Sequence, residues 1–166
     1  MGQAAGRVGT LPAVMEPKLV RVGVLGCGNV GAAFVQLVAQ QADSIAARTG
    51  LRLEITRVAV RNLARERDVE LPDGILTRDA HALVEDPDVD LVVEVIGGIE
   101  PARELIRTAI EHHKPVFTAN KELLANVGAA FVQLVAQQAD SIAARTGLRL
   151  VMRRETYDDL LACDLG

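Results

Sequence analysis

The first part of the chain alternates short apolar runs with a longer segment of helical spacing. Leu19–Leu25 is a β-branched apolar run that predicts a strand. A glycine-rich segment follows, and apolar residues then recur every three or four positions as far as Thr49-Gly50, which is typical of a helix with a glycine end. Leu51–Val60 begins with alternation and ends apolar. The pattern therefore indicates strand, tight turn, helix and strand in succession.

The rest of the chain continues this alternation with shorter elements. We predict a short strand at Ile75–Thr77, a short helix at Asp79–Val84, a strand buried on both faces at Val89–Ile96, a helix from Pro101 to Ile110, a short strand at Val116–Thr118 and a helix from Lys121 to Arg145. Strands that alternate with helices predict an α/β fold with a parallel sheet and right-handed crossovers.

Residues 29–53 recur letter for letter as residues 126–150. Packing alone does not keep so long a stretch identical, because exposed helix positions tolerate many side chains at less than about 0.5 kcal/mol each. We therefore interpret the copy as recent or artificial. The expected organisation is a disordered arm at 1–17, one domain at 18–125, the duplicated helix and strand at 126–150, packed on or extending that domain, and an irregular tail at 151–166.

Composition narrows the classes of partner. The chain has 166 residues, 49% of them apolar, which is enough for one domain with a sizeable core. A net charge of -4, one Tyr and no Trp argue against nucleic-acid binding. Absence of an 18-residue apolar run argues against a membrane span. Cys27 and Cys163 form no C-x-x-C pair, which favours a reducing compartment. We expect a soluble, cytoplasmic protein that binds small molecules.

Gly26, Gly28 and Gly31 form a G-x-G-x-x-G turn between the first predicted strand and helix, with Asn29 and Val30 inside it. In this context the pattern indicates a dinucleotide site. Gly26 makes the turn, Gly28 lets the backbone approach a pyrophosphate, and Gly31 allows close packing of helix on strand. The fold expected is thus a Rossmann-like, doubly wound sheet forming a single nucleotide-binding domain. The second copy retains only Gly128, so we expect one site.

The end of the second predicted strand bears on the choice of cofactor. An acid there grips the ribose 2′-hydroxyl of NAD, whereas an Arg favours the 2′-phosphate of NADP. The chain has Arg61 at that point, with Arg65 and Arg67 close behind. NADP is therefore preferred over NAD, which stays an alternative. Arginine is abundant in this chain, so ordinary surface charge also explains these residues.

Two blocks of sequence resemble the N-terminal nucleotide-binding domain of homoserine dehydrogenase. They are VRVGVLGCGNVG and VDLVVEVIGGIEPARELIRTAIEHHKPVFTANKELLA, and the resemblance covers Lys18–Ala125. The second block is the more specific, because many nicotinamide enzymes share the glycine turn. The resemblance implies an oxidoreductase that interconverts homoserine and aspartate semialdehyde with NAD(P)(H), in amino-acid biosynthesis from aspartate.

The resemblance also implies roles for single residues. Gly97 and Gly98 would border the nicotinamide ribose, Thr118 and Asn120 would line the nicotinamide end, and Lys121 would match a catalytic lysine. These residues follow predicted parallel strands, where open α/β sheets bind ligands. A plain turn stays the alternative interpretation of Gly97 and Gly98, and without the family Lys121 would be interpreted as a solvated surface lysine.

Other readings stay open. Glu94, at the end of a predicted buried strand, is either a hydrogen-bonded structural carboxylate or a ligand contact. His81, His112 and His113 lack metal or triad spacing, and the last two are typical of a helix C-terminus, so no metal is expected.

The family's substrate domain and dimerisation region are not recognisable here. We therefore expect a truncated homoserine dehydrogenase that is inactive unless a substrate domain is supplied, or alternatively a non-catalytic dinucleotide-binding or sensing module. Oligomerisation is left undecided by the sequence.

Overall fold

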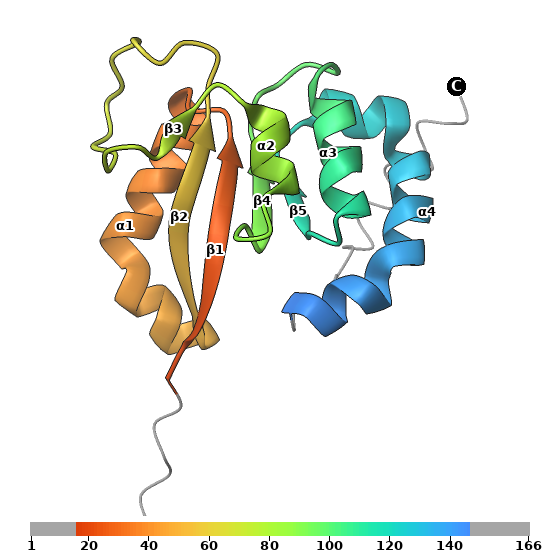
Figure 1. The fold of residues 1–166 in the computed structure, drawn as a ribbon, viewed down its shortest axis with the longest axis horizontal. Coiled ribbons are helices and arrows are strands. Elements are labelled where there is room, and N and C mark those ends of the chain that lie inside the picture. The colour runs from red at the N-terminus through yellow and green to blue at the C-terminus, as the bar shows by residue number, and fades with distance from the viewer. Residues whose placement is uncertain (1–15, 147–166) are drawn as a thin grey trace, which may run out of the picture.

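Five parallel strands form a single sheet in the computed structural model, which describes residues 16–146 (Figure 1). The strands are β1 (Lys18–Leu25), β2 (Leu51–Ala59), β3 (Leu76–Thr77), β4 (Leu91–Glu94) and β5 (Val116–Thr118). Their order across the sheet is β3-β2-β1-β4-β5, and each neighbouring pair is parallel. The chain thus crosses from β3 back over to β4 next to β1, and the predicted Rossmann-like fold is confirmed.

Helices cover both faces of this sheet (Figure 1). The first is α1 (Asn29–Thr49), which packs on one face. The short α2 (Ala80–Glu85) and α3 (Ala102–Glu111) pack on the other face. Finally, α4 (Lys121–Thr146) lies against α3, with which it shares an apolar cluster. This arrangement is the doubly wound topology expected from the sequence.

Strand β1 shows how one apolar run serves both faces. Val20, Val22 and Val24 belong to the core cluster that includes Val35 of α1. Leu25 belongs to the opposite cluster, with α2 and α3. Because successive side chains of a strand point to opposite faces, a strand buried on both sides is apolar nearly throughout. The continuous run in the sequence is explained by this central position.

Strand β4 is shorter than the predicted Val89–Ile96. All four of its residues are buried, as expected for a strand covered on both faces. Val89 instead lies in the loop before it, where its carbonyl accepts hydrogen bonds from Lys114 and Arg145 side chains. At the other end, Ile96 leaves the sheet and donates its backbone N–H to the Glu94 carboxylate.

Some expectations fall outside the described residues. They are most of the N-terminal arm, the strand expected at the end of the second copy, the C-terminal tail and Cys163. The proposed domain boundaries at 17/18, 125/126 and 150/151 remain predictions. Observed here is that the second copy is helical as far as Thr146.

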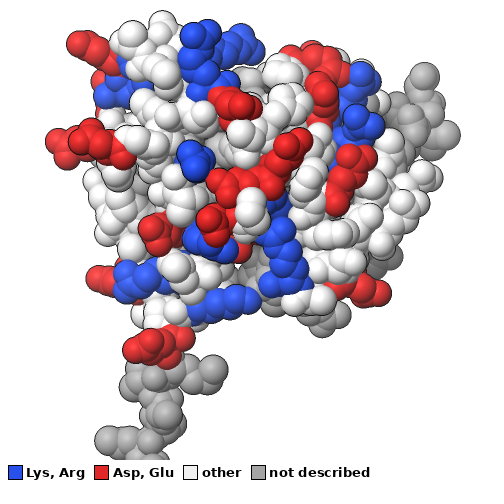
Figure 2. Space-filling model, viewed as in Figure 1, with Lys and Arg blue, Asp and Glu red and all other residues white. Residues whose placement is uncertain are grey.

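Acidic and basic side chains are interspersed on the face of the molecule shown in Figure 2. Several pair with one another across elements: Arg21 contacts Asp88 at 2.6 Å and Asp90 at 3.0 Å, and Arg57 contacts Asp86 at 3.1 Å. These pairs tie β1 and β2 to the loop before β4. Among the helices of residues 16–146, none combines the length and apolar character needed to traverse a bilayer.

Candidate dinucleotide site

Two glycines of the turn between β1 and α1 are required by the fold itself. Gly26 has φ of 100°, which disfavours other residues, and a Cβ on it would lie 3.0 Å from the Val95 carbonyl oxygen. A Cβ on Gly31 would lie 2.3 Å from the Gly26 carbonyl oxygen. Gly31 therefore lets α1 start close to the end of β1, which is the packing role that the sequence predicted.

Gly28 differs from both because the fold does not require it to be glycine. Its φ is -82°, which any residue adopts, and a Cβ placed on it meets nothing within 4 Å. It is the N-cap residue of α1, and no side chain caps this helix end. The first N–H groups of α1 are thus left for another partner. A glycine with open space beside an uncapped helix N-terminus fits a ligand phosphate that approaches the backbone closely.

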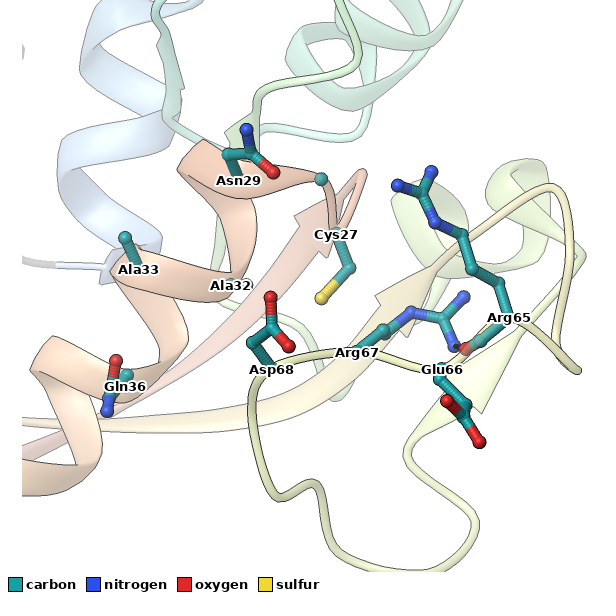
Figure 3. Close-up of a pocket in the computed structure, with 10 residues that line it drawn as sticks. Cys27, Asn29, Ala32, Ala33, Gln36, Arg65, Glu66, Arg67 and Asp68 are labelled. Atoms are coloured by element: carbon teal, nitrogen blue, oxygen red, sulfur yellow. Dashed lines mark hydrogen bonds between the residues drawn. The ribbon is translucent and has the colours of Figure 1, made fainter.

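A pocket of about 240 Å³ opens at this helix end (Figure 3). One wall comes from the glycine turn and the first two turns of α1, and the other from the loop between β2 and β3. Its lining is Cys27, Gly28, Asn29, Ala32, Ala33, Gln36, Arg65, Glu66, Arg67 and Asp68. Ligand pockets span about 300–1,000 Å³. This one is therefore suited to part of a dinucleotide, with the remainder extending along the edge of the sheet.

The loop after β2 holds three arginines in different situations. Arg67 is used within the loop: its guanidinium donates to the backbone carbonyls of Asn62 at 2.5 Å and Arg65 at 2.7 Å. Arg65 lines the pocket, and its side chain makes no hydrogen bond or ion pair in the described part of the chain. Arg61 is exposed two residues after the end of β2 and does not line the pocket. Arg65 is therefore the arginine best placed for a ligand in this pocket.

Cys27 contributes a thiol to the pocket wall beside Arg67 (Figure 3). Burial raises the pKa of this thiol, and the Arg67 guanidinium partly opposes that shift. A raised pKa keeps the sulfur neutral, so it adds no negative charge next to the uncapped end of α1.

A second group of predicted residues meets at the ends of β4 and β5. Glu94 is fully buried, and one carboxylate oxygen accepts from the backbone N–H of Ile96 at 2.7 Å. Its other oxygen accepts from the Thr118 hydroxyl at 2.5 Å. Asn120 donates its amide to the Gly98 carbonyl at 2.5 Å. Of the two readings of Glu94, the hydrogen-bonded structural carboxylate is the one that the geometry supports.

The remaining predicted residues lie around these two groups. Gly97 and Gly98 are exposed, with φ of 78° and 76°, and each has open space where a Cβ would be. Lys121 is exposed at the start of α4. Val30 is 60% exposed on the first turn of α1. Exposed groups thus gather where β1, β4 and β5 end, at the edge that binds ligands in open α/β sheets.

Two of the histidines, His112 and His113, lie at the C-terminal end of α3. His112 is the C-cap residue of α3, and its Nδ1 lies 2.8 Å from the Thr108 carbonyl oxygen. His113 follows with φ of 56°. Within residues 16–146, no group of three or more His, Cys, Asp or Glu side chains is arranged to hold a metal ion.

Comparison with known proteins agrees with this geometry. Residues 26–143 match the family model described as homoserine dehydrogenase, NAD binding domain. The chain belongs to this family. It is 42% identical over 134 residues to the homoserine dehydrogenase of Methylobacillus glycogenes, covering 81% of this chain and 32% of that protein. It is 40% identical over 111 residues to the Bacillus subtilis enzyme, covering 67% of this chain and 26% of that one.

Solved structures of homoserine dehydrogenases share the fold as well. The enzyme from Thiobacillus denitrificans superposes with a TM-score of 0.68 at 40% identity, covering 73% of this chain and 28% of that one. The chain thus spans between a quarter and a third of the length of the homoserine dehydrogenases named here.

Sequence reasoning did not single out several pocket residues of this homoserine dehydrogenase domain. Gln36, Glu66 and Asp68 line the pocket but carry no motif. Arg65 was noted only as a neighbour of Arg61. The available signal was distance along the chain: residues within two turns of the glycine turn, or in the loop after the second strand, have the best chance of facing the same ligand.

Proposed function

We propose that this domain binds one nicotinamide dinucleotide across the carboxyl edge of the sheet. The observation that carries the proposal is Gly28, a glycine that the fold does not need, next to a helix N-terminus that no side chain caps. The pyrophosphate belongs at that helix end, where N–H groups and the helix dipole favour negative charge. The strand order reverses between β1 and β4, the place where such sheets bind ligands.

The two halves of the dinucleotide take opposite sides of this switch point. The adenosine half belongs in the pocket between α1 and the loop after β2. The nicotinamide half belongs beside Gly97 and Gly98 and the turn that joins β5 to α4. The open space at both glycines supports this assignment, because it leaves the backbone accessible to a ribose.

For the choice of cofactor, we propose that NADP is preferred. Arg65 lines the adenosine pocket and has no partner for its guanidinium within residues 16–146, and Arg61 lies two residues beyond the end of β2. A guanidinium and a phosphate form a charge-assisted contact of about 1.5–3 kcal/mol. Asp68 also lines the pocket, and its carboxylate would instead suit the ribose hydroxyls of NAD. Comparing NADPH and NADH affinities in Arg65→Ala and Arg61→Ala separates the two arginines from each other and from Asp68.

For the whole protein, we propose the homoserine dehydrogenase reaction, oxidation of the homoserine hydroxyl to an aldehyde. The nicotinamide ring of a bound dinucleotide would supply the hydride acceptor. Lys121, exposed at the start of α4, is the residue of this chain proposed to take the hydroxyl proton. A general acid or base contributes about 10² to 10⁴ in rate. Correct positioning of the substrate lowers the activation barrier by about 7–11 kcal/mol. We assign this positioning to the part of the homoserine dehydrogenases that this chain does not match.

The binding proposal is tested by replacing Gly28. Gly28→Val should fold, because its Cβ meets open space, and should lose dinucleotide affinity, because the side chain fills the approach to α1. Residue 125 occupies the same position in the second copy, so Ala125→Val is the matched control and should bind like the unchanged chain. Fluorescence titration with NADPH and NADH measures both. Unchanged binding by a correctly folded Gly28→Val variant would remove the glycine turn from the proposal.

The alternative, a dinucleotide-binding module without catalysis of its own, rests on the short span of the chain relative to its relatives. A polypeptide of these 166 residues is expected to bind cofactor and to give no measurable NADPH formation with saturating homoserine. Turnover of about 1 per second or more that disappears in Lys121→Ala would show that these residues already hold a complete active site.

A further inference from the structure

The ends of β4 and β5 are joined by a closed circuit of hydrogen bonds. Thr118 donates its hydroxyl to Glu94 and accepts the backbone N–H of Asn120 at 3.0 Å. Asn120 then donates its amide to the Gly98 carbonyl. Glu94 accepts the backbone N–H groups of Ile96 at 2.7 Å and of Gly97 at 3.4 Å, which closes the circuit.

Burial makes this circuit effective. Glu94 is fully buried and Asn120 is 7% exposed, so neither exchanges its partners freely with water. Hydrogen bonds to buried partners are costly to leave unmade, about 1–3 kcal/mol for each group left unsatisfied. Gly97 and Gly98, by contrast, are exposed and have the backbone freedom of glycine. The hydrogen-bond circuit therefore restrains the backbone of Gly97 and Gly98, which glycine residues alone would leave free to move.

Asn120 also fixes the start of α4. Its side-chain oxygen accepts the backbone N–H of Leu123 at 3.0 Å, the geometry of a helix N-cap. Lys121 is the first residue of that helix. One side chain thus sets the place of the proposed catalytic lysine relative to the glycine loop.

We propose that Glu94 and Asn120 are positioning residues that hold the Gly97–Gly98 loop and the first turn of α4 in the arrangement that recognises the nicotinamide half of the cofactor. This rests on the proposed dinucleotide function. Asn120 acts through its bond to Gly98, and Glu94 through its bonds to Thr118 and to the loop backbone. Neither needs to touch the adenosine half, which belongs to the pocket on the far side of β1.

The test compares two ligands that differ in the nicotinamide half. NADPH carries it, and adenosine 2′,5′-bisphosphate lacks it. Asn120→Ser keeps a good N-cap for α4 but is too short to reach the Gly98 carbonyl, so it removes only the tether. Glu94→Gln keeps the shape of the side chain while replacing one accepting oxygen by a donor. Asn126→Ser is the control, since the Asn126 side chain is exposed and donates to the Glu122 carbonyl of its own helix.

Both positioning variants should bind NADPH roughly tenfold more weakly, the equivalent of about 1.4 kcal/mol. They should bind adenosine 2′,5′-bisphosphate as the unchanged chain does, and the control should alter neither affinity. Thermal unfolding establishes that each variant is folded. Equal weakening of both ligands, or no change for either, would overturn the positioning role while leaving the proposed function standing. An unchanged chain that binds neither ligand would overturn the proposed function and this inference with it.

Discussion

The two copies of the repeated segment form helices in which equivalent residues differ in burial. Helix α1 buries Gly31, Val35, Val38 and Ala46, the side that faces the sheet. In α4 the residue equivalent to Ile45 is Ile142, which is fully buried in the cluster with α3. Leu37 is 47% exposed in α1, whereas its equivalent, Leu134, packs against the α3 cluster. Neighbouring helix positions differ by about 100°, so burial of Ile142 in α4 and of Ala46 in α1 places neighbouring positions of the same sequence against different partners.

The segment allows both arrangements because its apolar residues are spread over more than one face. The packing partner then decides which residues are buried: the sheet for α1, and chiefly α3 for α4. The residues that precede each copy then decide its function. Before the first copy stand Gly26 and Gly28, which end a strand and leave a helix N-terminus open. At the equivalent of Gly26 stands Leu123, which is buried and helical.

The two helices differ chemically in where they begin relative to the repeated sequence. Helix α1 begins at Asn29, so its first N–H groups have no carbonyl one turn earlier to bond to. Asn126, the equivalent residue, lies inside α4, which begins at Lys121. The same sequence is therefore an anion-binding helix end in one place and a continuous packing helix in the other.

The largest expected difference between the copies is in the loss of stability when Ile142 or its equivalent Ile45 is replaced by Ala. Ile142→Ala removes a fully buried side chain and should lower the free energy of unfolding by about 2–4 kcal/mol. Ile45 is only partly buried, so Ile45→Ala should cost about 1 kcal/mol. Denaturant unfolding of the two variants measures both. Equal losses would mean that the two equivalent residues do not differ in burial.

A smaller difference is expected for the equivalent arginines. Arg145 donates to the Val89 carbonyl at 2.9 Å and to the His112 carbonyl at 3.1 Å, which ties α4 to two loops. Arg48 makes no such bond in the described part of the chain. We expect Arg145→Ala to cost about 1–2 kcal/mol and Arg48→Ala less than about 0.5 kcal/mol, measured as midpoint shifts in urea. A larger loss from the Arg48 variant would reverse the comparison.

The smallest expected effect is a shift in pH dependence at Lys114, which lies next to Arg145. Burial lowers the pKa of Lys114 to about 8, assisted by the Arg145 charge and opposed by Asp86 and Asp90. Between pH 8 and the ordinary value of 10.5 the unfolded chain holds a proton that the folded chain has released. The free energy of unfolding should therefore rise with pH across this window, and the contribution is lost as pH falls through 8.

Removing the Arg145 charge should raise the pKa of Lys114 and move this rise to higher pH. Unfolding free energies of the unchanged chain, Arg145→Ala and Arg48→Ala between pH 7 and 10.5 provide the measurement. Lys114→Met identifies the part of the slope that belongs to the lysine. A profile that is the same with and without Lys114 would contradict the assignment.

The fold was largely predictable because the alternation of apolar runs follows directly from a parallel sheet covered on both faces. Val116–Thr118 was predicted as a strand and is β5, and Asp79–Val84 was predicted as a helix and nearly coincides with α2. The burial of Ile142 and the packing of Leu134 in α4 were not predictable, because their equivalents Ile45 and Leu37 are more exposed in α1.

The candidate site was predictable only where backbone geometry demands a residue type. The glycine turn can be recognised in the sequence because Gly26 needs a positive φ and Gly31 lies too close to the Gly26 carbonyl for a side chain. The position of Arg65 in the pocket could not be predicted, because it depends on how Arg67 bonds to the backbone carbonyls of its own loop. The roles of Thr118 and Asn120 as internal partners of Glu94 and Gly98 likewise depend on contacts between separate strand ends.

The central claim, that identical helices serve binding in one copy and packing in the other, is tested most directly by the stoichiometry of dinucleotide binding. Calorimetric titration of the purified, monodisperse chain with NADPH, and with NADH in parallel, counts the sites. We expect one dinucleotide per chain, because α1 begins at an open glycine turn and α4 does not. Two dinucleotides per chain would show that the helix sequence itself binds the cofactor, and would contradict the account.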